Sequence, residues 1–376
     1  MPTALVIGAG IGGLAAAIGL RNGGYRVAVH ERATELKPLG AGLSLWPNAV
    51  RALRALGAAT RIEAEAEPID TMLVATRGGR AVLGPRQVAS ADGIPAYLVT
   101  RALLQSALLD ALGDHVICMG SELVDIDQDE ASATARFADS GTARADLIVI
   151  AGGIWSRQAS ALIGNPPRPC GYGGVLALSD PVDHPPSARR IAEYWGNRER
   201  FGVCDIGGGR RYWFHIVDQL PGAAPLSHDQ CLSRASDGWP DGIVQAVRAT
   251  PSDRLIAFEC HARPAPRRLG AGRILCVGDA AHAMEPNLGQ GACQALEDAV
   301  ALTVAARRAS PEQIVPAVEA MRLKRIRRFV AQSRQGRYGT HAPVVVRHLI
   351  HSALSLIPDP IHDKAIGSAH HMPDYR

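Results

Sequence analysis

Several features that would assign this sequence to a specialised class of protein are scarce or missing. Its seven cysteines are an odd number without a CxxC pair, which argues against a disulfide framework and a zinc ribbon. The net charge is only +4 and the arginines are scattered, so we expect no nucleic-acid-binding surface. No apolar run predicts a membrane-spanning helix, and the apolar N-terminal stretch lacks the basic segment of a signal peptide.

The composition that remains is typical of a globular protein. Of 376 residues, 47% are hydrophobic and 20% are charged, which is enough to bury a large core and to form two domains. Unpaired cysteines fit a reducing compartment, and we expect a cytoplasmic protein, either a monomer or a homodimer. His348 and His351 have no cysteine or carboxylate at ligand spacing, so we expect no metal site.

A glycine-rich turn follows the first apolar run of the chain. Residues 4–7 read as a buried strand, GAGIGG follows, and then comes a helix of small residues and a second apolar run at 25–29. In a strand–turn–helix–strand unit of this kind, Gly8 permits the tight turn and Gly10 lets the backbone approach a pyrophosphate. Gly13 lets the helix pack closely on the strand. The pattern predicts a dinucleotide site.

An acidic residue closes the second apolar run. Glu31 lies 18 residues after Gly13, where its carboxylate can accept a hydrogen bond from a ribose hydroxyl. We include the adjacent Arg32 in the same predicted cofactor site. The start of the first helix offers free N–H groups to the phosphates. These residues alone leave both FAD and NAD possible.

Two later stretches carry further signals. GDAAHAMEPNLGQGACQALEDA, residues 278–299, follows an apolar run and holds Asp279 and Pro286 before a predicted helix. VTRALLQSAL places Arg101 in the first turn of another helix. With its GxGxxG turn, GD motif and GQG helix in this order, the chain resembles the class A FAD-dependent monooxygenases, the family of para-hydroxybenzoate hydroxylase. The resemblance covers about residues 3–335.

The resemblance implies both a fold and a reaction. The fold would be α/β, with a Rossmann-like FAD-binding domain, an antiparallel β-sheet substrate domain and C-terminal helices. NADH or NADPH, as a transient co-substrate, would reduce FAD, and O2 would add at flavin C4a. The resulting hydroperoxide would hydroxylate or epoxidise a small aromatic or alkene substrate. An enzyme that used NAD alone would have no need of the later motifs, so the resemblance selects FAD.

The resemblance also implies roles for individual residues. Asp279 would accept a hydrogen bond from a ribityl hydroxyl, and Arg101 would also reach FAD. Pro286 would lie at the flavin edge, where oxygen and substrate meet, and we count it as catalytic. Backbone N–H groups beside the flavin pyrimidine would come from Gly289, Gly291 and Ala292. A structural alternative for Asp279 is that it caps the helix that follows it.

One motif departs from the family pattern. The family's middle motif has an aspartate and a closing arginine where this chain has Gly152 and Ala159. Gly153 and Ser156 are kept, so we expect the turn to form, and Arg157 could replace the arginine in part. The change leaves a second hypothesis open: a flavin-binding protein with weak or lost reduction by NAD(P)H, acting as an isomerase or a ligand-binding protein.

The middle of the chain has the alternation and glycine turns of an antiparallel sheet. We expect both domains to be discontinuous in sequence. The predicted FAD-binding domain comprises 1–68, 98–165 and 262–337, the substrate domain 69–97 and 166–261, and the C-terminal helical tail 338–376.

An aromatic run, YWFH, gives the candidates for the substrate pocket. Only alternate residues of a strand share a face, and we place Trp213 and His215 on the pocket face. Packing of these side chains in the core is the alternative. His215 is the candidate base that would deprotonate a phenol, and Arg200 and Trp195 are further candidates for contact with the substrate.

Overall fold

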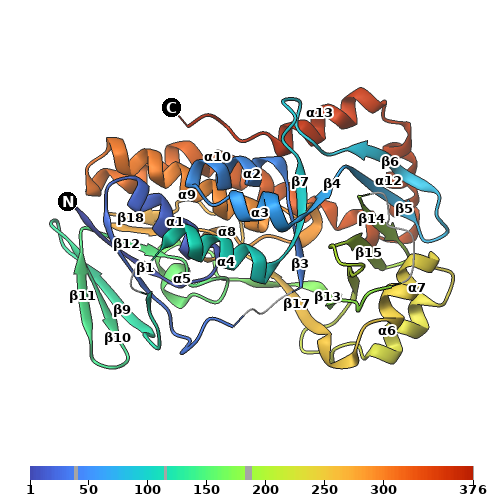
Figure 1. The fold of residues 1–376 in the computed structure, drawn as a ribbon, viewed down its shortest axis with the longest axis horizontal. Helices are drawn as coiled ribbons and strands as arrows, with labels where there is room; N and C mark the ends of the chain where they lie inside the picture. Colours follow the sequence, from blue (N-terminus) through green and yellow to red (C-terminus); the bar gives the residue numbers. More distant parts are fainter. Residues whose placement is uncertain (38–40, 114–116, 183–188, 376) are drawn as a thin grey trace.

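A computed structural model of the protein describes residues 1–37, 41–113, 117–182 and 189–375. These residues form two large β-sheets, which lie toward opposite ends of the molecule with helices around and between them (Figure 1). Two three-stranded sheets accompany the large ones. The predicted fold class, an α/β domain with a second sheet and C-terminal helices, is confirmed.

The first large sheet has six strands in the order β18–β19–β12–β1–β2–β8. Its neighbouring strands pair in parallel, except β18 with β19. Parallel strands covered on both faces are unbroken apolar runs, as in the fully buried β12. The strands are β1 (Thr3–Ile7), β2 (Arg26–His30), β8 (Ile117–Cys118), β12 (Leu147–Ile150), β18 (Gly270–Ala271) and β19 (Ile274–Cys276).

Two helices from distant parts of the chain pack against each other beside this sheet. They are α1 (Ile11–Asn22) and α9 (Gly291–Arg308). They approach closely because Gly19 has no side chain: a Cβ there would lie 2.4 Å from the backbone oxygen of Ala299. Other helices of the same core are α2 (Pro47–Leu56), α3 (Thr60–Glu65), α4 (Arg101–Leu112), α5 (Arg157–Ile163), α8 (Asp279–His282) and α10 (Ile314–Gly336).

The two three-stranded sheets are antiparallel. One consists of β9 (Leu123–Gln128), β10 (Ala133–Phe137) and β11 (Thr142–Ala145). The other consists of β3 (Gly42–Leu45), β4 (Glu67–Ile69) and β7 (Ala96–Thr100). β7 leads directly into α4, where the Thr100 hydroxyl accepts a hydrogen bond from the Leu103 N–H (3.1 Å) and caps the helix. This cap places Arg101 at the first position of α4.

The second large sheet has seven strands in the order β17–β13–β16–β15–β14–β5–β6. All of its pairs are antiparallel except β14 with β5. Two of its strands come from before α4, so two separate stretches of sequence build it. The strands are β5 (Thr71–Thr76), β6 (Ala81–Gln87), β13 (Arg168–Leu178), β14 (Arg190–Trp195), β15 (Glu199–Asp205), β16 (Arg211–Asp218) and β17 (Ile256–Ala262).

One face of this sheet is covered by α6 (His228–Ala235) and α7 (Asp241–Arg248). The Ser227 hydroxyl accepts a hydrogen bond from the Gln230 N–H, and the Gln230 side chain accepts one from the Ser227 N–H, so a capping box starts α6. Between the helices and the sheet lies a separate hydrophobic cluster that includes Val175, Ala177, Phe201, Trp213, Cys231, Ile243 and Val247.

The predicted position of Trp213 and His215 on the pocket face is wrong. Both side chains are fully buried on the face that α6 and α7 cover. Trp213 Nε1 donates to Thr250 Oγ1 (2.8 Å), and the His215 ring stacks on Phe201 with ring centroids 3.8 Å apart. The alternation of β16 therefore turns Phe214 to the opposite face. The alternative, packing in the core, describes Trp213 and His215.

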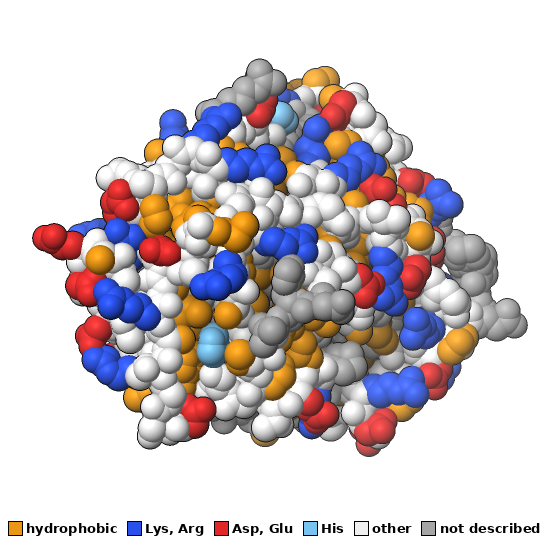
Figure 2. Space-filling model, turned by 60° about the vertical axis from the view of Figure 1, so that its left-hand side comes forward, with side chains coloured by type: hydrophobic (Ala, Val, Ile, Leu, Met, Phe, Trp, Pro, Cys, Tyr) orange, Lys and Arg blue, Asp and Glu red, His pale blue; other side chains and the backbone are white. Residues whose placement is uncertain are grey.

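The C-terminal part of the chain is helical and reaches both halves of the molecule. It consists of α11 (Tyr338–His341), α12 (Val344–Leu356) and α13 (Asp359–His370), with α12 beside β6 and α13 beside α2 (Figure 1). Within the described part of the chain, none of the helices is both long and apolar enough to span a membrane. On the face seen in Figure 2, Lys and Arg side chains are interspersed with Asp and Glu.

Candidate cofactor and substrate site

A cleft opens where the carboxyl ends of β1, β2 and β12 meet. β1 lies between the other two strands, so their loops converge on the edge of the sheet where α/β folds bind ligands. The cleft encloses about 570 Å³. Its lining includes Gly8, Gly10, Glu31, Arg32, Gly152, Gly153, Trp155, Ser156 and Arg157.

The three glycines of the first turn are needed for different structural reasons. Gly8 has a φ of 107°, and a Cβ there would lie 2.6 Å from the backbone oxygen of Ala151. A Cβ at Gly13 would lie 1.8 Å from the Gly8 oxygen, so α1 could not pack on the turn. A Cβ at Gly10 would meet no described atom within 4 Å. Gly10 therefore leaves open space at the start of α1, where no side chain caps the helix.

Glu31 is held at the end of β2 beside this turn. Its Oε2 accepts a hydrogen bond from the Ala9 N–H (2.7 Å), and its Oε1 accepts one from the Ala33 N–H (2.9 Å). The side chain is half-exposed and lines the cleft together with the exposed Arg32. Both predicted residues therefore lie in the cleft that the glycine turn borders.

The middle motif, which differs from the family pattern at Gly152 and Ala159, forms its turn as predicted. Gly153 has a φ of 72°, and the Ser156 hydroxyl accepts a hydrogen bond from the Ala159 N–H (3.2 Å), which starts α5. Ala159 is fully buried, whereas Gly152 and Arg157 are exposed in the cleft. A Cβ at Gly152 would lie 3.4 Å from the Ser156 Cβ, an ordinary contact, so the position has room for a side chain.

A buried arginine that sequence reasoning missed supports this turn. Arg263 is 1% exposed and donates to the backbone oxygens of Ile154 (2.6 Å) and Ser156 (3.2 Å). Its Nε donates to the backbone oxygen of Asp279 (3.1 Å). Arg263 thus joins the middle motif to the GD motif. No local pattern marks it, because its partners are far away in the sequence.

The GD motif presents an exposed carboxylate. Gly278 has a φ of 57° and precedes α8, and its N–H donates to Asp298 Oδ2 (3.0 Å). Asp279 is the first residue of α8 and is exposed. Its carboxylate has no hydrogen-bond partner among the described residues, so capping of the helix does not explain it. The side chain is free to accept a hydrogen bond from a ligand.

The GQG turn exposes the start of α9. Pro286 is exposed and begins a short 3-10 helix (Pro286–Leu288), and Gly289 follows with a φ of 61°. Gly291 and Ala292 are the half-exposed first residues of α9, which no side chain caps. The unpaired N–H groups and the positive end of the helix dipole therefore favour an anionic ligand.

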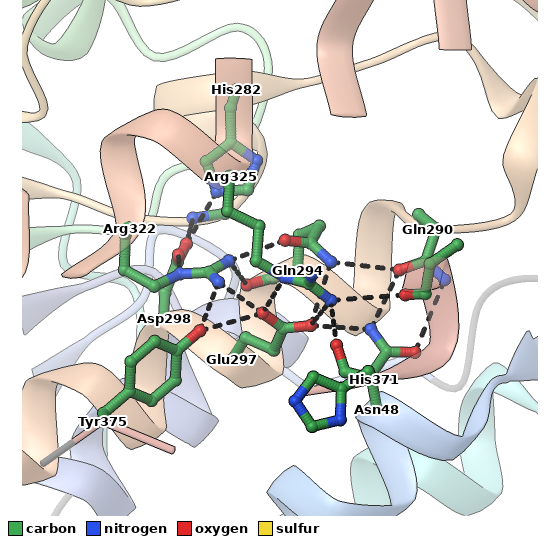
Figure 3. Close-up of polar contacts among 12 residues, drawn as sticks. Asn48, His282, Gln290, Gln294, Glu297, Asp298, Arg322, Arg325, His371 and Tyr375 are labelled. Atoms are coloured by element: carbon green, nitrogen blue, oxygen red, sulfur yellow. Dashed lines mark hydrogen bonds and ion pairs between the residues drawn. The ribbon is translucent and has the colours of Figure 1, made fainter. Parts of the chain in front are cut away.

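A buried polar network supports the GQG turn from behind (Figure 3). Asn48 Nδ2 donates to Gln290 Oε1 (3.0 Å) and to Glu297 Oε1 (2.7 Å). Arg322 donates to Glu297 and to Asp298 Oδ1 (2.8 Å). The network joins α2, α9 and α10. Its hydrogen bond to the Gln290 side chain fixes the position of the GQG turn. The residues labelled in Figure 3 are Asn48, His282, Gln290, Gln294, Glu297, Asp298, Arg322, Arg325, His371 and Tyr375.

Arg101 is connected to the same turn through β3. Its N–H donates to the backbone oxygen of Ala41 (3.1 Å), next to β3. β3 also approaches the GQG turn, because a Cβ at Gly289 would lie 2.8 Å from Ser44 Oγ. The Arg101 side chain is exposed. The fold therefore brings the Arg101 segment and the GQG segment together through β3.

The face of the second sheet opposite α6 and α7 carries polar groups beside Pro286. Tyr172 of β13 donates its hydroxyl to Glu285 Oε2 (2.8 Å), next to Pro286 in the chain. Arg200 of β15 is 2% exposed and donates to Asn287 Oδ1 (2.7 Å) and to Glu193 Oε1 (3.0 Å). Tyr172 and Arg200 lie on the face that also bears Phe214, and Glu285 and Asn287 contact them from the segment around Pro286. Of these groups, sequence reasoning had found only Arg200. They give an aromatic wall a buried cation and hydrogen-bonding groups.

Trp195 lies further along this face. Its ring packs on Gly339 and lies 5.3 Å from the His351 ring, measured between centroids. The predicted substrate residue therefore contacts the C-terminal helices α11 and α12.

These features fit FAD. The cleft has a glycine turn and an uncapped helix start for phosphates and a carboxylate for a ribose. A second exposed carboxylate, Asp279, and a second uncapped helix start lie in the GD and GQG segments. A mononucleotide would leave this second set of groups without a partner.

Comparison with known proteins also indicates that this chain binds FAD. The family model described as an FAD binding domain matches residues 1–330. The chain is 36% identical to the aurachin C monooxygenase/isomerase of Stigmatella aurantiaca over 345 residues, 88% of each chain. It is 32% identical to the FAD-dependent urate hydroxylase of Klebsiella pneumoniae, again over 88% of each chain.

A solved structure of the Klebsiella enzyme HpxO with FAD and uric acid is also similar. It superposes with a TM-score of 0.89 at 27% identity, covering 98% of this chain and 96% of that one. The family match, which spans most of the chain, agrees with the two sets of cofactor-binding features in the structure. The chain therefore belongs to the FAD-binding family of flavin-dependent monooxygenases.

Proposed function

We propose that this enzyme uses NADH or NADPH to reduce FAD and then transfers one oxygen atom of O2 to a small, electron-rich aromatic or heteroaromatic substrate. The observation that carries this proposal is the group of Tyr172, Arg200, Glu285 and Asn287 beside Pro286. It provides hydrogen-bonding groups and a cation on an aromatic wall, which suits a flat ring that bears oxygen or nitrogen atoms.

The chain's own residues would hold FAD at three places. Gly8, Gly10 and Gly13 at the start of α1 would receive the pyrophosphate, and Glu31 and Arg32 the adenosine. Asp279 and Arg101 would fix the ribityl chain. Gly289, Gly291 and Ala292 would contact the flavin pyrimidine, where the positive end of α9 stabilises negative charge on the ring. When bound, FAD supplies electron transfer and oxygen activation.

Arg200 would orient the substrate. Its guanidinium is backed by Glu193 and Asn287, and its Nε has no hydrogen-bond partner among the described residues. This cation would stabilise the negative charge on a ring oxygen that has lost its proton, and the ionised ring is more reactive toward an electrophilic oxygen than the neutral one. Pro286 would separate this substrate region from the flavin edge. Trp195 would bound the substrate region on the side of the C-terminal helices.

The proposed domain organisation follows the two large sheets. Residues 1–68, 98–165 and 262–337 would form the FAD-binding domain, and 69–97 with 166–261 the substrate domain. The presence of β5 and β6 in the second sheet supports this division. We propose a cytoplasmic enzyme that is active as a monomer or a homodimer.

The test is reduction of the bound flavin without oxygen. Purified protein loaded with FAD is mixed with NADH or NADPH, with and without a panel of phenols and heteroaromatic compounds, while the visible flavin absorption is followed. Bleaching that one compound accelerates supports the proposal and indicates its substrate class. Flavin that stays oxidised with every donor and compound contradicts it and favours an isomerase or a ligand-binding protein.

Gly152 gives this test a variant with an expected direction. The family carries an aspartate at this position, and the turn has room for one. We expect Gly152→Asp to accelerate reduction of the flavin by NAD(P)H severalfold. Gly78→Asp is the matched control, because Gly78 is also exposed and a Cβ there meets no described atom within 4 Å. An equal effect of both substitutions would contradict a role of position 152 in reduction.

A further inference from the structure

We propose that Cys170 and Cys260 form a redox-active dithiol that takes up hydrogen peroxide on the substrate side of the flavin site and closes to a disulfide. Both are free cysteines on adjacent strands of the second sheet. The supply of peroxide rests on the proposed function, whereas the reactivity of the pair does not.

The register of β13 and β17 brings the two residues together. Pro169 lies opposite His261 and Gly173 lies opposite Glu259 in this antiparallel pair, so Cys260 faces the irregular stretch 170–172, which begins with Cys170. Opposite residues have Cβ atoms about 4.5–5.5 Å apart, and a disulfide needs about 3.5–4.5 Å. The register shifts between Pro169 and Gly173, and an irregularity of this kind gives the strand local freedom to close the remaining distance.

The surroundings distinguish the two thiols. Cys260 is 4% exposed and clusters with Tyr172 and Ile216, while the half-buried Cys170 packs on this cluster. Hydrogen bonding from Cys170, helped by the Tyr172 hydroxyl, lowers the pKa of Cys260 although burial opposes this. The same contact raises the pKa of Cys170. Within this proposal, Cys260 acts as the attacking thiol and Cys170 as the resolving one.

The pair lies close to the place where peroxide would arise. Tyr172 contacts Cys260 and donates its hydroxyl to Glu285 Oε2 (2.8 Å), and Glu285 precedes Pro286 at the proposed flavin edge. A reduced flavin that meets O2 without a ring to oxygenate passes both electrons to O2, which yields hydrogen peroxide. Such peroxide would meet this dithiol on its way out of the substrate region.

The chemistry balances with hydrogen peroxide as the only oxidant. The Cys260 thiolate attacks one peroxide oxygen, the O–O bond breaks, and sulfenic acid and hydroxide form. The Cys170 thiol then attacks the Cys260 sulfur, an S–S bond forms, and the sulfenic oxygen leaves as water. The proton that Cys260 lost when it became a thiolate converts the hydroxide to a second water. In sum, two thiols and one hydrogen peroxide give one disulfide and two waters.

The other described cysteines are poorer candidates. Burial raises the pKa of Cys231 to about 11 and those of Cys276 and Cys293 to about 12. Burial also raises the pKa of Cys204. Cys118 is half-buried in β8, in the other large sheet, and serves as the control.

The first experiment adds hydrogen peroxide stepwise, up to one equivalent, to the reduced-thiol, FAD-loaded enzyme. The thiols that remain are counted, and the tryptic peptides are analysed without reduction. We expect two of the seven thiols to disappear and one cross-link to join peptides 158–189 and 255–267, which hold Cys170 and Cys260. Cys118→Ser should leave this result unchanged, and Cys260→Ser should leave Cys170 as a thiol. Oxidation spread over all exposed thiols, or no cross-link, overturns the dithiol.

The second experiment tests the source of the peroxide. The enzyme is incubated in air with NADH or NADPH but no ring substrate, with and without catalase. We expect the same cross-link in both samples, because peroxide made beside the pair reacts before it reaches the catalase. A cross-link that catalase abolishes overturns the local supply. An enzyme that NAD(P)H does not reduce contradicts the proposed function, and the first experiment still decides on the dithiol.

Discussion

At the scale of single residues, two buried arginines have different tasks. Arg263 is held by backbone oxygens of the middle turn and of Asp279, so it supports the cofactor side. Arg200 is held by Glu193 and Asn287, and it lies on the face of the second sheet opposite α6 and α7. Removal of Arg200 should therefore affect the substrate rather than FAD.

We expect Arg200→Met to raise the KM for the ring substrate about 10- to 100-fold, because a hydrogen bond to a charged group contributes about 1.5–3 kcal/mol. Affinity for FAD should stay the same. Steady-state kinetics and FAD titration measure both quantities. Arg198→Met is the control, since Arg198 is exposed and pairs with Asp218 on the surface. A fall in FAD affinity without a change in KM would show that Arg200 contributes to cofactor binding and not to substrate binding.

At the scale of elements, local motifs were predictable and strand faces were not. The glycine turn, the turn of the middle motif at Gly153 and Ser156, and the start of α4 depend on neighbours within a few residues, so the sequence predicts them. β16 is apolar on both faces, because helices cover one face and the substrate region borders the other. Alternation then tells which residues share a face but not which face that is, and Trp213 was misplaced for this reason.

The start of α1 offers a paired test of two glycines. Gly13→Ala would place a methyl group 1.8 Å from the Gly8 oxygen, so we expect the protein without FAD to lose about 1–3 kcal/mol of its unfolding free energy. Gly10→Ala meets no described atom within 4 Å and should unfold like the parent protein, yet bind FAD at least tenfold more weakly. Urea unfolding and FAD titration separate the two effects. Equal stability losses in both variants would contradict this division of tasks.

At the scale of the whole molecule, one polar network joins distant segments behind the flavin turn. It combines α2, α9, α10 and the C-terminal end of the chain (Figure 3). Sequence reasoning missed it, because most partners, such as Asn48 and Glu297, are far apart in sequence and buried charges follow no periodic pattern. The network can be tested through its acid sensitivity and through its C-terminal end.

Asp298 should make the folded state sensitive to acid. Burial would raise its pKa, but His282 and Arg322 lower it to about 2, below the value of about 3.9 in an unfolded chain. A depressed pKa contributes stability above pH 4, and this stability is lost as the pH falls from about 4 to about 2. We expect Asp298→Asn to be about 3–5 kcal/mol less stable at neutral pH and to lose less stability on acidification. Urea unfolding across this pH range measures both, with the exposed Asp110→Asn as the control.

The end of the chain should also contribute to the flavin site. The Tyr375 hydroxyl accepts a hydrogen bond from Arg322 Nη1 (2.6 Å) and donates one to Glu297 Oε2 (3.0 Å). Tyr375→Phe keeps the ring but leaves these buried partners short of a hydrogen bond, which should cost about 1–3 kcal/mol of unfolding free energy.

Because Glu297 also binds Asn48, and Asn48 holds Gln290 of the GQG turn, FAD affinity should fall severalfold in the same variant. Urea unfolding and FAD titration measure the two effects, and the half-exposed Tyr338→Phe serves as the control. A variant that is less stable but binds FAD normally would show that the network supports the fold without positioning the turn. A variant that matches the parent protein in both would exclude the C-terminal end from either role.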